Sequence, residues 1–136
     1  MLIFKGAKDI NSYIKGCKIQ NKVIGFVPTM GALHEGHLSL INKSNEVADI
    51  TVCSIFINPT QFNNPDDLKK YPVTIENDTY LLEKNDCDVL FLPDVKEVYP
   101  DGYNNNVHFD LGYLETILEG KYRPGHFQGV CQVVKR

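Results

Sequence analysis

Short apolar runs alternate with amphipathic segments along most of this chain, and this alternation limits the possible folds more than any other feature. Three runs have the length and the β-branched content of buried strands: residues 23–27, 49–57 and 88–93. Three segments carry the periodicity of helices: residues 8–20, 37–48 and 74–85. Continuous apolar strands separated by helices predict an α/β fold, with a parallel sheet covered by helices on both faces.

The pattern is weaker near two loops, residues 28–37 and 58–65, and in the last third of the chain. Pro28 is expected to end the first strand. Thr74 is expected to be the N-cap of the helix over 74–85. The asparagines and prolines of residues 58–65 predict a loop. Beyond the third strand we expect an edge strand over 106–111, a short helix over 113–119 and a further helix over 125–135.

Composition excludes several classes of protein. With 136 residues the chain has the size of one domain, and 43% apolar and 23% charged residues are typical of a folded globular protein. The formal net charge of −3 argues against a nucleic-acid-binding protein or one held on anionic lipid. The longest apolar runs are about six residues, far short of the ~20 that span a membrane, so no membrane partner is expected.

The four cysteines and the chain end carry two further expectations. The cysteines are evenly spread without a C-x-x-C pair, which favours reduced thiols in the cytoplasm over a disulfide framework or a zinc cluster. The sequence stops inside an apolar run, Val133-Val134-Lys135-Arg136. We therefore expect this to be the front part of a longer protein.

The loop after the first strand has the chemistry of a phosphate site. Ligands of parallel α/β sheets bind at the carboxyl ends of the strands, where this loop lies. His34 and His37 stand at the start of a helix, whose N–H groups and partial positive charge favour anions. Gly31 and Gly36 allow a ligand to approach the backbone closely. Two imidazoles in this place can donate hydrogen bonds to a nucleotide phosphate as charge builds on it.

Two other interpretations of the histidine pair are weighed against this one. A zinc site of the His-Glu-x-x-His kind needs the second histidine one residue later and a third ligand, so we predict no metal ligands here. The other alternative is that two surface histidines simply cap the helix.

Two more segments carry polar chemistry whose meaning the residues leave open. Asn58 and Gln61 flank Pro59, and their amides suit a small polar, partly anionic substrate, although asparagine and proline also favour ordinary turns. Residues 120–130 bring Lys121, Arg123 and His126 together. This segment could add positive charge near phosphates, or it could be an exposed turn that leads into a helix.

Three motifs in order resemble one enzyme family. Residues 28–41 resemble the signature of the pantothenate synthetases (pantoate–β-alanine ligases), a variant of the H-x-G-H motif of nucleotidyltransferases. Residues 55–62, Ile-Phe-Ile-Asn-Pro-Thr-Gln-Phe, resemble the second family motif, and residues 120–134 resemble the third. The resemblance covers the whole chain. It implies a Rossmann-like fold of the H-x-G-H nucleotidyltransferase type, in which residues 1–136 form a nucleotide- and pantoate-binding N-terminal domain.

The resemblance also implies a reaction in two steps. Pantoate attacks the α-phosphate of ATP, which gives pantoyl-adenylate and pyrophosphate. The amine of β-alanine then attacks the acyl carbon and expels AMP. Mg²⁺ is implied as a cofactor of the first step, and a homodimer is implied as the assembly.

Site residues follow from the same resemblance, position by position. His37 is implied as the catalytic proton donor, with His34 assisting at the phosphates. ATP is expected to contact the whole first loop: Pro28, Thr29, Met30, Gly31, Ala32, Leu33, His34, Glu35, Gly36 and His37. Pantoate and β-alanine are expected to contact a second set: Gln61, Asn58, Tyr71, Val133 and Val134.

The chain departs from the family in two ways. Relatives continue to a Lys-Asp segment and a Ser-Arg-rich segment that hold phosphates, and neither is in this sequence. Cys131-Gln132 also precedes the valines where the family usually has a threonine. Two alternatives therefore stay open: another small nucleotidyltransferase, and a truncated domain that binds ATP or pantoate without full turnover.

Overall fold

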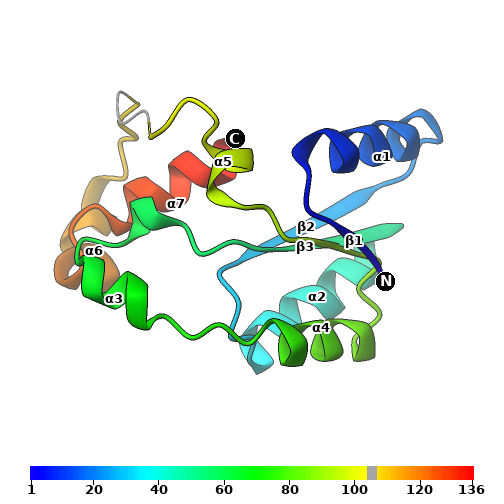
Figure 1. The fold of residues 1–136 in the computed structure, drawn as a ribbon, viewed down its shortest axis with the longest axis horizontal. Helices are drawn as coiled ribbons and strands as arrows, with labels where there is room; N and C mark the ends of the chain where they lie inside the picture. Colours follow the sequence, from blue (N-terminus) through cyan, green and yellow to red (C-terminus); the bar gives the residue numbers. More distant parts are fainter. Residues whose placement is uncertain (104–106) are drawn as a thin grey trace.

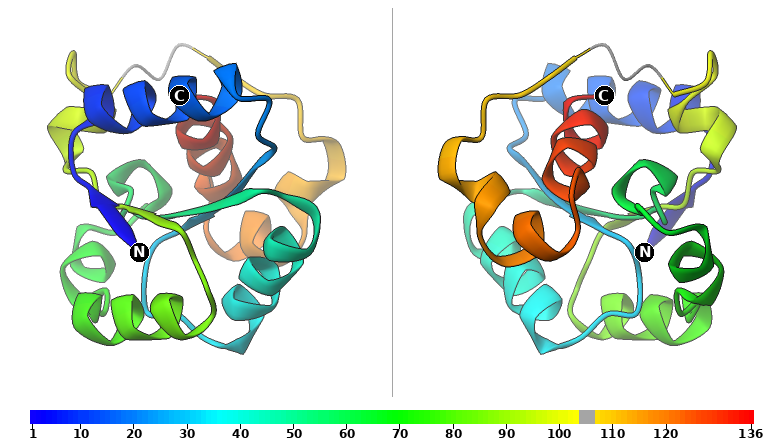
Figure 2. Two further views of the ribbon diagram at one scale, coloured as in Figure 1. Left: turned by 90° about the vertical axis from the view of Figure 1, so that its right-hand side faces the viewer. Right: turned by 90° about the vertical axis from the view of Figure 1, so that its left-hand side faces the viewer.

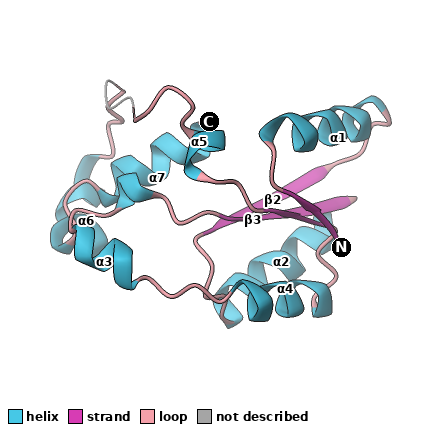
Figure 3. Ribbon diagram, viewed as in Figure 1, coloured by secondary structure: helices cyan, strands magenta, loops and turns pink. Residues whose placement is uncertain are grey.

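A four-stranded parallel sheet forms the centre of the molecule (Figure 1, Figure 3). The computed structural model describes residues 1–103 and 107–136. The strand order is β1-β4-β3-β2, and the strands are β1 Leu2–Phe4, β2 Ile24–Thr29, β3 Ile50–Ile55 and β4 Val89–Phe91. Every pair of neighbouring strands is parallel. The predicted α/β class with a parallel sheet is therefore confirmed.

Helices cover both faces of this sheet, as predicted. Figure 2 shows α1 (Ala7–Ile19) on one face and α2 (Glu35–Val47) with α4 (Ile75–Lys84) on the other. The core beneath α2 and α4 is centred on the fully buried Ile41, Leu82 and Leu90. The core beneath α1 is centred on Ile10, Val52 and Val89. The central strands are apolar on both faces because each face is covered.

The remaining elements gather beyond the carboxyl ends of the strands (Figure 1). They are the short helices η1 Pro59–Gln61, α3 Pro65–Lys70, α5 Val95–Val98, η2 Gly112–Thr116 and α6 Leu118–Tyr122, and the longer helix α7 His126–Lys135. The predicted helix over 125–135 is thus confirmed. β1, α3 and α5 were not predicted, because each is too short to show a period in the sequence.

Three predictions about these elements are wrong. The edge strand expected over 106–111 is not formed by residues 107–111, and Asn106 lies outside the described residues. The helix expected over 113–119 is divided into η2 and α6, because Ile117 is extended and Leu118 has a φ of +47°. Pro28 does not end β2, which continues to Thr29; β2 is at the sheet edge, where proline is tolerated.

All four cysteines are free thiols, and Cys17, Cys53 and Cys87 are buried. Burial raises the pKa of Cys53 to about 12, so this thiol stays protonated. None of the helices in the described ranges has the length and apolarity that crossing a membrane requires.

Candidate active site

The loop between β2 and α2 contains two consecutive residues in the left-handed region. Gly31 has a φ of +86° and Ala32 a φ of +49°. A Cβ at Gly31 would lie 3.1 Å from both the Asp78 carboxylate and the Ile55 side chain, so glycine fits this position on both conformational and steric grounds. The turn brings the chain from the carboxyl end of β2 to the start of α2.

Asp78 of α4 holds this turn from beneath. Its side chain is fully buried, and its two oxygens accept hydrogen bonds from the backbone N–H groups of Ala32, at 3.0 Å, and Leu33, at 2.8 Å. Thr74 occupies the predicted N-cap position, but its hydroxyl donates to Asp78 at 3.1 Å instead of capping a backbone N–H. Asp78 was not predicted as a functional residue, because an acidic residue in the first turn of a helix is expected on dipole grounds alone.

The two histidines form a reciprocal cap at the start of α2. The helix begins at Glu35, two residues earlier than predicted, so that His34 is the N-cap and His37 is the third helical residue. His34 Nδ1 accepts the N–H of Gly36 at 3.1 Å, and His37 Nδ1 accepts the N–H of His34 at 3.4 Å. The capping alternative is therefore confirmed, and it does not exclude a chemical role.

This cap fixes which ring nitrogen of each histidine carries its proton. A nitrogen that accepts an N–H has no proton of its own, so in each neutral ring the proton is on Nε2. The two ring centroids are 4.0 Å apart. The cap already uses the backbone N–H of Gly36. The side-chain donors that this helix end offers to an anion are the Nε2–H groups of the two adjacent rings.

His37 is held in its neutral form. Burial lowers its pKa from the usual 6.5, and the neighbouring His34 lowers the pKa further, while Asp78 opposes both effects. At neutral pH the ring is therefore an uncharged donor. It can stabilise a charge that develops on a bound group without carrying a charge of its own.

Asn58 and Gln61 play different parts in the second loop. Asn58 is fully buried, and its Oδ1 accepts hydrogen bonds from the Thr60 N–H at 3.2 Å, the Thr60 hydroxyl at 3.0 Å and the Tyr99 hydroxyl at 3.0 Å. Its Nδ2 donates to the carbonyl of Gly129 in α7 at 3.2 Å. Both ends of this amide are occupied within the protein, so Asn58 shapes the turn and anchors it to α7.

Gln61 presents its side chain differently. The hydrogen bonds that it makes with described residues all involve its backbone: its N–H donates to Asn58, and its carbonyl accepts from Arg123 and His126. The side chain is largely buried and lines a cavity. Its amide is therefore placed to bind another molecule.

One cavity of about 640 Å³ brings the three sequence motifs together at the carboxyl ends of the strands, and it reaches beneath α1. Its wall includes seven of the residues predicted from the sequence: Pro28, Thr29, Met30, His37, Gln61, Val133 and Val134. Most of the remaining wall is apolar, and the sheet contributes Phe26, Val52 and Phe91. A volume of this size is typical of small-molecule sites.

The other predicted site residues lie outside the wall of this cavity. Ala32 and Leu33 bind Asp78 through their backbone, and His34 reaches the site through its contact with His37. Tyr71 packs edge-on against Phe62, with ring centroids 5.5 Å apart. Those not in the wall are Gly31, Ala32, Leu33, His34, Glu35, Gly36, Asn58 and Tyr71.

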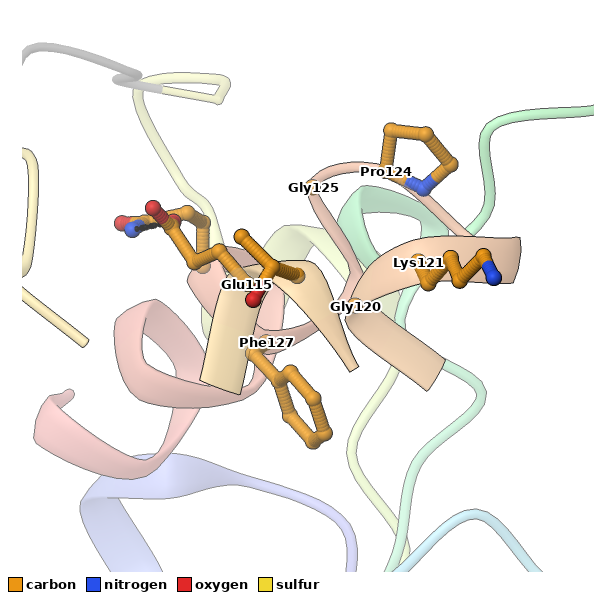
Figure 4. Close-up of a pocket in the computed structure, with 8 residues that line it drawn as sticks. Glu115, Gly120, Lys121, Pro124, Gly125 and Phe127 are labelled. Atoms are coloured by element: carbon orange, nitrogen blue, oxygen red, sulfur yellow. Dashed lines mark hydrogen bonds between the residues drawn. The ribbon is translucent and has the colours of Figure 1, made fainter. Parts of the chain in front are cut away.

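The basic segment 120–130 divides its charges between two places. His126 lines the large cavity, whereas Lys121 lines a separate pocket of about 410 Å³ between η2, α6 and α7 (Figure 4). That pocket also includes Glu115 and Phe127, and it shares no residue with the large cavity. Lys121 therefore adds no charge to the wall of the candidate site.

The described part of the chain contains no set of side chains that could bind a metal ion on its own. In residues 1–103 and 107–136, no three His, Cys, Asp or Glu side chains form a group that could hold a metal ion. The buried carboxylate nearest the first loop, Asp78, already accepts three hydrogen bonds. These residues do not fit a resident Mg²⁺, so none of the chemistry below is assigned to one.

Fold and site together define an α/β domain with a parallel sheet and a small-molecule cavity at the carboxyl ends of its strands, and comparison with known proteins identifies its family. The family model for pantoate-beta-alanine ligase matches residues 2–136, and the chain belongs to that family. It is 50% identical over 137 residues to pantothenate synthetase of Flavobacterium psychrophilum and 47% identical over 133 residues to that of Aquifex aeolicus. It covers 48% and 46% of these two proteins, so the chain spans about half the length of the curated relatives that it matches.

Solved structures agree with this assignment. The pantoate-beta-alanine ligase of Francisella tularensis, complexed with beta-gamma ATP and beta-alanine, superposes with a TM-score of 0.89 at 48% identity, over 99% of this chain and 51% of that one. Pantothenate synthetase of Thermus thermophilus superposes with a TM-score of 0.80 at 38% identity, over 100% of this chain and 47% of that one. These findings confirm the predicted family and its nucleotidyltransferase-like fold.

The same findings decide between the alternatives left open by the sequence. Another small nucleotidyltransferase is excluded, because the family model covers nearly the whole chain. The truncated, binding-only domain is not favoured, since the relatives matched are named as synthetases and ligases.

Proposed function

We propose that this chain catalyses the ATP-dependent condensation of pantoate with β-alanine through a pantoyl-adenylate. The observation that carries the proposal is the meeting of His37 and Gln61 in the wall of one cavity. The two residues come from different strand ends, and each bears the chemistry that one substrate requires. Family membership and the ATP and β-alanine named in the Francisella complex support the same reaction.

The first loop serves the nucleotide in this proposal. Residues 28–37 contact ATP, and the Nε2–H groups of His37 and His34 donate to its phosphate oxygens. In the first step the pantoate carboxylate attacks the α-phosphorus and pyrophosphate leaves. A neutral, fixed donor at His37 stabilises the charge that builds on the phosphoryl oxygens, and it needs no reorganisation as the reaction proceeds.

The second loop and α7 serve the acid. The Gln61 amide binds the polar groups of pantoate, and Val133 and Val134 pack against its apolar carbons. In the second step the β-alanine amine attacks the acyl carbon of the adenylate and AMP leaves. Because both reactants are held in one cavity with an apolar wall, positioning and exclusion of water supply much of the rate.

The remaining expectations from the sequence belong to the same proposal. Asn58 and Tyr71 act on the substrate side through Gln61 and Phe62, and residues 1–136 form the nucleotide- and pantoate-binding domain. Mg²⁺ enters with the nucleotide phosphates. A cytoplasmic location agrees with the four free thiols. We also propose a homodimer, which sedimentation velocity tests.

The experiment that tests the proposal is an assay of AMP formation by this chain with ATP and pantoate, with and without β-alanine. We expect AMP release that depends on β-alanine and that is unchanged in Lys121→Ala, a surface variant outside the cavity. AMP release that is absent, or that does not depend on β-alanine, would contradict the proposed reaction.

A further inference from the structure

The backbone carbonyl of Gln61 is the meeting point of two basic side chains that have no assigned role. Arg123 Nη2 donates to this oxygen at 3.2 Å, and His126 Nδ1 lies 3.3 Å from it. Both come from more than sixty positions further along the chain. Because a carbonyl oxygen only accepts hydrogen bonds, His126 must carry a proton on Nδ1. We propose that Arg123 and His126 are positioning residues, which fix Gln61 so that its amide faces the substrate cavity.

The guanidinium of Arg123 is itself held in place before it reaches Gln61. Glu119, one helical turn earlier, pairs with Arg123 Nη1 at 3.2 Å. The guanidinium also lies over the Phe62 ring, 5.6 Å from its centroid. A planar group fixed on two sides loses little freedom when it makes a third contact, so its hydrogen bond to Gln61 is favourable.

Close packing of α7 against η1 reinforces this arrangement. A Cβ at Gly129 would lie 2.5 Å from the carbonyl oxygen of Thr60, so the helix approaches the turn more closely than any side chain allows. The carbonyl of Gly129 also accepts the hydrogen bond from Asn58. The turn is thus fixed just before Gln61 as well as at its carbonyl, and the side chain of Gln61 lies against Gly129, where a Cβ would be 3.0 Å from its Cγ.

This inference gives the basic segment a different role from phosphate binding. Arg123 and His126 direct their donors at a backbone oxygen of the second loop. Loss of either donor should therefore affect the ligand bound by Gln61, the hydroxy acid, and spare the nucleotide. The inference rests on the proposed function for that ligand, but the contact itself is testable without any ligand.

The experiment combines titration calorimetry with ¹⁵N NMR on this chain. Pantoate and ATP are titrated separately into wild type, Arg123→Ala, His126→Gln and His126→Asn. We expect about tenfold weaker pantoate binding for Arg123→Ala and His126→Gln, with ATP binding within about twofold of wild type. His126→Asn should regain most of the pantoate affinity, because its amide N–H lies near the position of Nδ1. Lys121→Ala is the matched cationic control and should bind both ligands normally.

The outcomes separate this inference from the function on which it rests. Wild-type pantoate affinity in both Arg123→Ala and His126→Gln would overturn it, as would equal losses for pantoate and ATP. The ¹⁵N spectrum should show a proton on Nδ1 of His126, and a proton on Nε2 alone would also overturn it. If wild type binds neither ligand while His126 carries its proton on Nδ1, the proposed function fails, and the positioning role fails with it.

Discussion

The two halves of the candidate site are built in opposite ways. In the first loop, imidazoles accept backbone N–H groups at Nδ1 from residues within three positions. In the second loop, the backbone carbonyl of Gln61 accepts a hydrogen bond from Nδ1 of His126, which is 65 positions further along the chain. The histidine cap of the first loop is a local structure that a short motif encodes, and Asp78 adds one long-range support to the turn before it. The second loop depends on the docking of a distant helix. Local contacts fix the two histidines of the first loop, and long-range contacts fix Gln61 of the second.

This difference explains which parts of the site could be predicted. The H-x-G-H motif identified His34 and His37, because the residues that form a helix cap are close together in the sequence. The amides of Asn58 and Gln61 looked equivalent in the sequence. Only the buried contacts to Thr60, Tyr99 and Gly129 show that Asn58 is structural. Packing partners far apart in the chain leave no periodic signal.

The fold was predicted where elements were long and periodic. Continuous apolar runs predicted β2, β3 and β4, and helical periods predicted α1, α2 and α4. The region between β4 and α7 was predicted poorly. The division into η2 and α6 depends on the left-handed conformation of Leu118 and on the close approach of the backbone at Gly120. A Cβ at Gly120 would clash with the carbonyl oxygen of Leu114, a contact between turns that no sequence pattern reveals.

The largest expected effect breaks the local half of the site. His37→Ala removes the fixed Nε2–H donor, and we expect adenylate formation to fall by roughly 10²–10⁴-fold, the usual range for such groups. Pyrophosphate release measures this step. His108→Ala removes an exposed histidine outside the large cavity and should leave the rate unchanged. A His37→Ala rate within a factor of a few of wild type would mean that His37 has no catalytic role.

The second prediction removes the support beneath the same loop. Asp78→Ala leaves the buried N–H groups of Ala32 and Leu33 without acceptors, and we expect the free energy of unfolding to fall by about 2–4 kcal/mol. Urea denaturation measures it. Asn77→Ala, an exposed neighbour on α4, serves as the control. A loss no larger than that of the control would show that the turn does not depend on Asp78.

The third prediction breaks the long-range half. Gly129→Ala forces α7 away from Thr60, and overpacking of this kind costs about 1–3 kcal/mol. Pantoate affinity should fall with it, while ATP affinity should not. Gly16→Ala is the matched control, because a Cβ there has open space and alanine favours a helix. Normal pantoate binding by Gly129→Ala would separate the docking of α7 from the acid site.

The smallest expected effect is a pH dependence. Because the pKa of His37 is lowered in the folded chain, the unfolded chain binds a proton first as pH falls below about 6.5. The contribution of His37 to stability is therefore complete above pH 6.5 and is lost as pH falls through its lowered pKa. NMR titration of the ring should give a midpoint below 6.5, and Asp78→Asn should lower it further. A midpoint at or above 6.5 would contradict the neutral donor.

The most direct test of the central claim compares two ligands across two variants. Calorimetry with ATP and with pantoate is performed on wild type, His37→Ala and Gln61→Ala. We expect Gln61→Ala to weaken pantoate by about tenfold with little change for ATP, and His37→Ala to weaken ATP with little change for pantoate. Equal losses of both ligands in each variant would contradict the account, because a site with two independently built halves must lose one ligand at a time.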